Sequence, residues 1–76
     1  MIEQRLCIAG LGLMGGSLAR ALKDKTRHII GVDRHAATRQ QALEDGVVDL
    51  ATESLATGVK KADLVILATP VRAILE

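Results

Sequence analysis

A glycine-rich turn constrains the fold of this chain more than any other feature of its sequence. Residues 10–15 read Gly-Leu-Gly-Leu-Met-Gly and follow a continuously apolar run at 6–9. Such a run is typical of a strand buried on both faces. From Met14 to Leu22 the apolar residues recur at helical spacing. A G-x-G-x-x-G turn between a strand and a helix is the context in which this motif holds the phosphates of a dinucleotide.

The rest of the chain alternates between apolar runs and helical patterns. Strands are predicted at 29–32, 47–48 (short at best) and 64–68, and helices at 14–22, 36–45, 54–61 and 71–76. Gly46 is placed to end the helix at 36–45. This alternation is typical of a parallel sheet with helices on both faces, and right-handed crossovers order its strands 3-2-1-4. The predicted fold class is therefore α/β, a Rossmann-like sheet of about four strands. Because a complete fold of this type has about six strands, we expect residues 1–76 to be a partial NAD(P)-binding domain of a longer enzyme.

Each glycine of the turn has a physical task in this prediction. Gly10 permits the tight turn off the first strand, Gly12 lets the backbone approach a pyrophosphate, and Gly15 lets the helix pack on the strand. The N–H groups of Leu13 and Met14, together with the helix dipole, are expected to bind phosphate oxygens. The alternative is a glycine-rich turn that binds no ligand.

Asp33 argues against that alternative. It lies eighteen positions after Gly15, at the end of the second predicted strand. An acidic residue there accepts hydrogen bonds from the adenosine ribose hydroxyls, although Asp33 also suits the N-cap of the next helix. A carboxylate repels a 2′-phosphate, so NAD is predicted rather than NADP. Arg34 favours NADP instead, because an arginine at this position can pair with a 2′-phosphate. The alternative roles of Arg34 are stacking on the adenine or a solvated charge at the start of the helix.

The carboxyl end of the last predicted strand is a second candidate for ligand contact. Ligands of open α/β sheets bind at this edge. Thr69 follows that strand and is expected either to face the nicotinamide half of the cofactor or to serve as an ordinary strand terminator.

Composition excludes several other classes of function. Ten basic and nine acidic residues leave a net charge of +1 and no basic stripe, and there is no Phe, Tyr or Trp. We therefore expect no nucleic-acid or membrane partner. The single cysteine, Cys7, allows neither an internal disulfide nor a clustered zinc site, which suits a reducing cytoplasm. It lies in the strand predicted at 6–9 and is expected to be an inert packing residue. No metal-binding, hydrolase or P-loop motif occurs.

The quoted motifs resemble the opening of the prephenate/arogenate dehydrogenases. The resemblance rests on GLGLMGGSLA at 10–19, GVDR at 31–34, ALEDGVVD at 42–49 and ADLVILATPVR at 62–72. It covers essentially the whole chain in the same order and spacing. The double glycine followed by serine, and the run ATPVR, are its more specific parts.

This resemblance implies an oxidoreductase of tyrosine biosynthesis that oxidatively decarboxylates prephenate or arogenate with NAD(P). It implies a cytoplasmic and usually dimeric enzyme whose catalytic histidine and substrate-binding arginine lie beyond residue 76. No catalytic residue is therefore assigned here. The cofactor contacts it implies are Gly10, Gly12, Leu13, Met14, Asp33, Arg34, Thr69, Pro70 and Val71.

Two other functions fit the same residues. One is another β-hydroxyacid-type dehydrogenase, since 6-phosphogluconate-like enzymes open with a similar turn. The other is a nucleotide-binding module without catalysis.

The last predicted strand also bears on assembly. An unpaired apolar edge at 64–67 would invite pairing with another chain, so self-association is expected.

Overall fold

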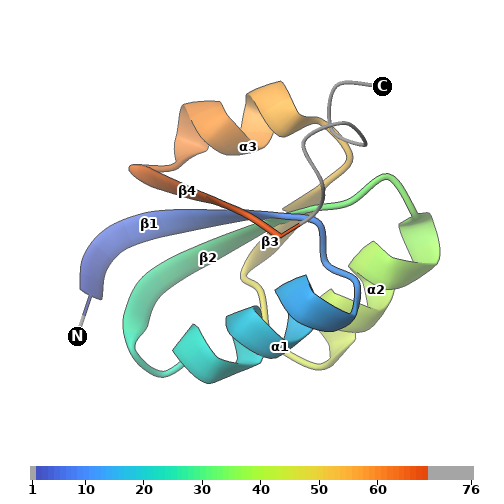
Figure 1. The fold of residues 1–76 in the computed structure, drawn as a ribbon, viewed down its shortest axis with the longest axis horizontal. Coiled ribbons are helices and arrows are strands. Elements are labelled where there is room, and N and C mark those ends of the chain that lie inside the picture. Colours follow the sequence, from blue (N-terminus) through green and yellow to red (C-terminus); the bar gives the residue numbers. More distant parts are fainter. Residues whose placement is uncertain (1, 69–76) are drawn as a thin grey trace.

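The structure is a computed structural model that describes residues 2–68 of the chain (Figure 1). Its elements are β1 (Ile2–Ala9), α1 (Leu13–Leu22), β2 (Thr26–Val32), α2 (Ala36–Glu44), β3 (Leu50–Thr52), α3 (Leu55–Lys61) and β4 (Leu64–Leu67). The helix predicted at 71–76 lies outside the described residues. Across residues 2–68, no helix has the length and apolar character needed to cross a lipid bilayer.

The strands form one parallel sheet in the order β3-β2-β1-β4. β1 lies at its centre, where Leu6 is opposite Ile29 of β2 on one side and Leu64 of β4 on the other. Helices α1 and α2 cover one face of the sheet and α3 covers the other (Figure 1). The predicted α/β class, the strand order 3-2-1-4 and the helices on both faces are confirmed.

The core is built around β1, whose last four residues are buried on both faces of the sheet. On the α1 side, Ile8 packs in one cluster with Ala19. On the α3 side, Cys7 packs in a second cluster with Val32, and partly buried Leu55 of α3 rests against it. Burial raises the pKa of the Cys7 thiol, which keeps the group protonated. Cys7 therefore contributes packing, as predicted from its place in a buried strand.

The third strand begins later than predicted. Val47 and Val48 are 4% and 5% exposed, but they lie in the connection between α2 and β3. The Val47 N–H donates to the Ala42 carbonyl at the end of α2, at 3.1 Å. Pairing starts only at Leu50, which is opposite Ile30. The strand predicted at 47–48 is therefore wrong. These valines are loop residues that pack in the core below α2. Apolar character alone does not distinguish a buried loop residue from a buried strand residue.

The end of α2 agrees with the sequence pattern. Asp45 is the C-cap, and Gly46 follows with a φ of +69°, the left-handed conformation that favours glycine. The Gly46 N–H donates to the Leu43 carbonyl at 3.1 Å. Gly46 therefore stops the helix as expected and turns the chain back toward the sheet.

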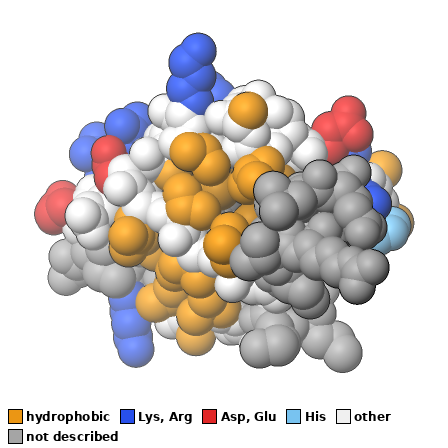
Figure 2. All heavy atoms as spheres, turned by 45° about the horizontal axis from the view of Figure 1, so that its top comes forward, with side chains coloured by type: hydrophobic (Ala, Val, Ile, Leu, Met, Phe, Trp, Pro, Cys, Tyr) orange, Lys and Arg blue, Asp and Glu red, His pale blue; other side chains and the backbone are white. Residues whose placement is uncertain are grey.

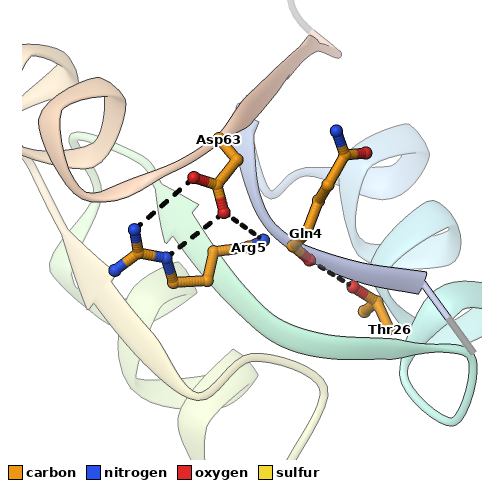
Figure 3. Close-up of polar contacts among 4 residues, drawn as sticks. All are labelled: Gln4, Arg5, Thr26 and Asp63. Carbon is orange, nitrogen blue, oxygen red and sulfur yellow. Dashed lines mark hydrogen bonds and ion pairs between the residues drawn. The ribbon is translucent and has the colours of Figure 1, made fainter.

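Polar contacts at the amino ends of the strands hold β1 to its neighbours (Figure 3). The Arg5 N–H donates to Asp63 Oδ2 at 2.9 Å, and the Asp63 N–H donates to the Arg5 carbonyl at 2.8 Å. The Arg5 Nε lies 3.3 Å from the same carboxylate oxygen. On the other side, Thr26 Oγ1 donates to the Gln4 carbonyl at 3.1 Å. The hydrogen bonds from Arg5 hold the pKa of Asp63 below its usual value.

Candidate functional site

Backbone hydrogen bonds connect the carboxyl ends of the strands. The Gly10 N–H donates to the Val32 carbonyl at 2.7 Å, and the Ala68 N–H donates to the Ala9 carbonyl at 2.9 Å. The Asp33 N–H donates to the Thr52 carbonyl at 3.1 Å. The glycine turn, the end of β2 and the end of β4 therefore meet at one edge of the sheet, where open α/β folds bind their ligands.

Two glycines of the turn are required by the fold itself. Gly10 has a φ of +96°, which a residue with a side chain rarely adopts. A Cβ added at Gly15 would coincide with the Gly10 carbonyl oxygen and would lie 3.3 Å from the Ala68 Cβ. Gly15 therefore lets α1 pack directly on the turn, which is the packing task that the sequence predicts for it.

Gly12 is different because the described structure gives it no steric reason to be glycine. It is exposed, its φ of −63° is open to any L-residue, and a Cβ built there meets no atom within 4 Å in residues 2–68. The position is therefore bare backbone that faces outward at the start of a helix.

Helix α1 begins directly after this position. Its N-cap is Gly12, and the first bond of the helix runs from the Gly16 N–H to the Gly12 carbonyl at 2.8 Å. By helical geometry, the N–H groups of Leu13, Met14 and Gly15 have no partner within the helix. The first turn contains no acidic residue, so the positive end of the helix dipole is not offset by a carboxylate there. This arrangement suits an anion.

Asp33 lies beside the turn, and protein N–H groups hold its carboxylate in place. Oδ2 accepts from the Leu11 N–H at 2.9 Å, and Oδ1 accepts from the His35 N–H at 2.9 Å and contacts His35 Nδ1 at 3.1 Å. Burial of the Asp33 side chain opposes its ionisation, but these hydrogen bonds outweigh burial, and the pKa of Asp33 lies below its usual value. The group is therefore a carboxylate at neutral pH.

The alternative role of Asp33 as a helix N-cap is wrong. The N-cap of α2 is His35, and the Asp33 carboxylate instead accepts from the backbone N–H two residues on, which is an Asx-turn. The Asp33 carbonyl accepts from Arg39 Nη1 at 2.8 Å. Arg34 is exposed beside it. The Asp33 carboxylate therefore contacts the glycine turn through Oδ2 and the N-cap residue of α2 through Oδ1.

The structure assembles most, but not all, of the residues singled out in the sequence. It brings Gly10, Gly12, Gly15, Asp33 and the start of α1 to one place. Arg34 follows Asp33 in the chain and is exposed. The remaining three candidates, Thr69, Pro70 and Val71, lie outside the described residues. The described chain ends at Ala68, whose Cβ is close to Gly15.

Three contributors to this corner were not identified from the sequence. They are Leu11, His35 and Arg39, which hold the side chain or the carbonyl of Asp33. An aspartate in a turn commonly accepts a hydrogen bond from the backbone N–H two residues on, so Asp33 itself is a signal for its contact with the His35 N–H. No local pattern signals the other two, because tertiary packing brings them to Asp33.

Comparison with known proteins places the chain in a family. A family model for "Prephenate dehydrogenase, nucleotide-binding domain" matches residues 18–76. Prephenate dehydrogenase of Bacillus subtilis (strain 168) is 43% identical over 72 residues, which cover 92% of this chain and 19% of that protein. The chain spans 19–25% of the length of the curated relatives it matches.

Two solved structures of dehydrogenases share the fold of this chain. Prephenate dehydrogenase from A. aeolicus, in complex with hydroxyphenyl propionate and NAD+, has a TM-score of 0.84 and 32% identity, covering 97% of this chain and 27% of that one. Synechocystis arogenate dehydrogenase has a TM-score of 0.82 and 37% identity, covering 93% and 25%. The resemblance stated from the sequence is confirmed, and the chain belongs to the prephenate dehydrogenase family, in which it matches the nucleotide-binding domain.

Proposed function

We propose that residues 1–76 supply part of the NAD-binding domain of a dehydrogenase that oxidatively decarboxylates prephenate or arogenate. The observation that carries this proposal is Gly12. The fold explains Gly10 by its positive φ and Gly15 by its packing, whereas nothing in residues 2–68 requires a glycine at position 12. Close approach of a pyrophosphate to the backbone supplies the missing reason.

In the proposed complex, the pyrophosphate lies over Gly12 and accepts hydrogen bonds from the amides of Leu13 and Met14. The dipole of α1 favours its negative charge. The solved relative that contains NAD+ supports this choice of ligand class.

Asp33 is proposed to bind the adenosine ribose, and this contact favours NAD over NADP. The carboxylate is ionised and already fixed by Leu11 and His35, so it would repel a 2′-phosphate placed against it. Arg34 is exposed next to it and is assigned to the adenine or to solvent. Thr69, Pro70 and Val71 continue the chain from β4 and are proposed to line the nicotinamide half of the cofactor.

The nicotinamide, when bound, would take up a hydride as the substrate loses carbon dioxide. The described residues contribute binding and orientation: α1 holds the phosphates and Asp33 holds the ribose. The groups that bind the substrate and move its proton are proposed to come from other parts of the enzyme.

The test is calorimetric titration of the protein with NAD. Gly12→Ala should weaken NAD binding at least tenfold while the melting temperature stays close to that of the wild type, because the added methyl group meets ligand rather than protein. Ala21→Ser, an exposed position near the other end of α1, is the control and should leave affinity unchanged. Unchanged NAD affinity in a folded Gly12→Ala variant would overturn the proposal.

A further inference from the structure

We propose that the His35 side chain competes with the ribose of the bound dinucleotide for Oδ1 of Asp33, and that it thereby weakens cofactor binding, most strongly when the imidazole is protonated. The inference rests on the proposed function, because it assumes that Asp33 receives the ribose. It adds a residue that tunes this contact.

The Asp33 carboxylate has a limited number of acceptor positions. A carboxylate offers about four lone-pair positions, two on each oxygen. Oδ1 already takes the His35 N–H at 2.9 Å and His35 Nδ1 at 3.1 Å, and Oδ2 takes the Leu11 N–H at 2.9 Å. A ribose diol brings two donors, whereas only one position on Oδ2 is left. Bidentate binding of the diol therefore requires one protein donor to leave.

The three protein donors to Asp33 differ in how easily they can leave. The N–H groups of Leu11 and His35 belong to the glycine turn and to the N-cap of α2, so the backbone fixes both of them. The imidazole is on a rotatable side chain that is 73% exposed, whereas the Asp33 side chain is 11% exposed. Water can replace the hydrogen bond of the imidazole at little cost, so the imidazole is the donor that a ribose hydroxyl displaces.

The charge of the imidazole decides how strongly it competes with the ribose. The charged groups at this corner are Asp33, Arg34 beside it, and Arg39 of α2, whose guanidinium donates to the Asp33 carbonyl. Among residues 2–68, Asp33 is the carboxylate that pairs with His35. Protonation turns the Nδ1 contact into a charge-assisted hydrogen bond, which is stronger than the neutral one. The ribose must then displace a stronger competitor, so the Kd for NAD should rise as the pH falls.

The opposite role is also physically reasonable and makes a different prediction. If the imidazole instead held the carboxylate in the orientation that the ribose needs, removing it would weaken NAD binding. The sign of the change in Kd therefore separates competition from positioning.

The experiment is calorimetric titration with NAD at about pH 8 and about pH 5.5, the range across which histidine side chains take up a proton. The wild type, His35→Ala and the control His28→Ala are compared; His28 lies on β2 and pairs with Asp49. We expect His35→Ala to lower the Kd by about two- to tenfold at the lower pH, the equivalent of one hydrogen bond, and to remove most of the pH dependence. His28→Ala should behave as the wild type does.

A second measurement follows the imidazole directly. In NMR spectra, saturating NAD should shift the His35 ring resonances, because the ring loses its carboxylate partner. Weaker or unchanged NAD binding in His35→Ala, or a pH dependence that persists in it, would overturn the competition. Absence of NAD binding by the wild type at both pH values would instead overturn the proposed function itself.

Discussion

The carboxylate of Asp33, at the end of β2, accepts a hydrogen bond of 2.9 Å from the backbone N–H of Leu11 in the glycine turn. These residues are 22 positions apart. The bond joins the part of the site proposed for the ribose to the part proposed for the pyrophosphate. A change at Asp33 should therefore affect both the stability of the turn and the affinity for the cofactor.

Replacement of Asp33 tests this double role. Asp33→Ala removes the acceptor of two backbone N–H groups, and we expect it to lower the free energy of unfolding by about 1–3 kcal/mol and NAD affinity by at least about tenfold. Denaturant unfolding and calorimetry measure the two effects separately. Asp33→Asn keeps an acceptor oxygen and should recover stability more than affinity. Unchanged or tighter NAD binding in Asp33→Ala would show that the ribose is not bound there.

Cofactor preference follows from the charge of the same carboxylate. We expect the protein to bind NAD about ten- to a hundredfold more tightly than NADP. A hydrogen bond to a charged group contributes about 1.5–3 kcal/mol, and NADP lacks the 2′-hydroxyl that would donate one to Asp33. Arg34→Ala should reduce the remaining NADP affinity and leave NAD affinity nearly unchanged. Competitive titration with both cofactors measures the ratio, and equal affinities in the wild type would contradict the assignment.

Substitution by alanine should lower the stability of the protein at Gly15 and change it little at Gly12. In Gly15→Ala the new Cβ would collide with the Gly10 carbonyl, which is backbone and cannot rotate away. We expect a loss of at least about 1–3 kcal/mol of stability, the usual cost of overpacking. Gly12→Ala should melt close to the wild type. Thermal unfolding followed by circular dichroism compares them, and equal melting temperatures would contradict the structure of the turn.

The regular part of this fold could be predicted from the sequence because its signals are local. The apolar run in β1, the helical spacing after Met14 and the glycine after α2 each report on a few neighbouring residues. The order of the strands then follows from the handedness of the crossovers. Local patterns of this kind also indicate the glycine turn and the acidic residue beside it.

The rest depends on contacts between residues far apart in the chain. Val47 and Val48 have the composition of a strand, but their burial comes from packing below α2, so pairing waits until Leu50. The geometry of Asp33 depends likewise on Leu11 and Arg39, which tertiary structure brings to it. Periodicity carries no information on such contacts, and for this reason the N-cap alternative for Asp33 could not be rejected from the sequence.

The dependence of stability on pH follows from two carboxylates whose pKa values are lowered on folding. For Asp33 and Asp63 the hydrogen bonds that the carboxylates accept hold the folded pKa below its usual value. Their contribution is therefore present above that value and is lost as the pH falls through the folded pKa. We expect the free energy of unfolding to decrease below about pH 4. Asp63→Asn should flatten part of this decrease. Denaturant titrations at fixed ionic strength, from roughly pH 2.5 to roughly pH 7, measure the free energy of unfolding across the range in which these carboxylates titrate. Identical profiles for variant and wild type would contradict the assignment.

The exposed side of β4 leads to a prediction about assembly. In residues 2–68, β4 pairs with β1 and with no other strand. Leu64 and Leu67 are 46% and 50% exposed, and Val59 of the adjacent α3 is 43% exposed. Figure 2, in which the α3 side is turned forward, shows apolar side chains gathered on the surface. An unpaired apolar edge is a template for pairing with another chain.

We therefore expect this chain to self-associate through β4, with a sedimentation coefficient that rises with protein concentration. Leu67→Lys places a charge at the edge and should return the chain to the monomer, because a desolvated ammonium group opposes pairing. Leu43→Lys is the matched control: Leu43 is 42% exposed but lies on α2, on the other face of the sheet from α3. A wild-type chain that stays monomeric at all concentrations, or a Leu43→Lys variant that dissociates equally well, would show that β4 is not the contact.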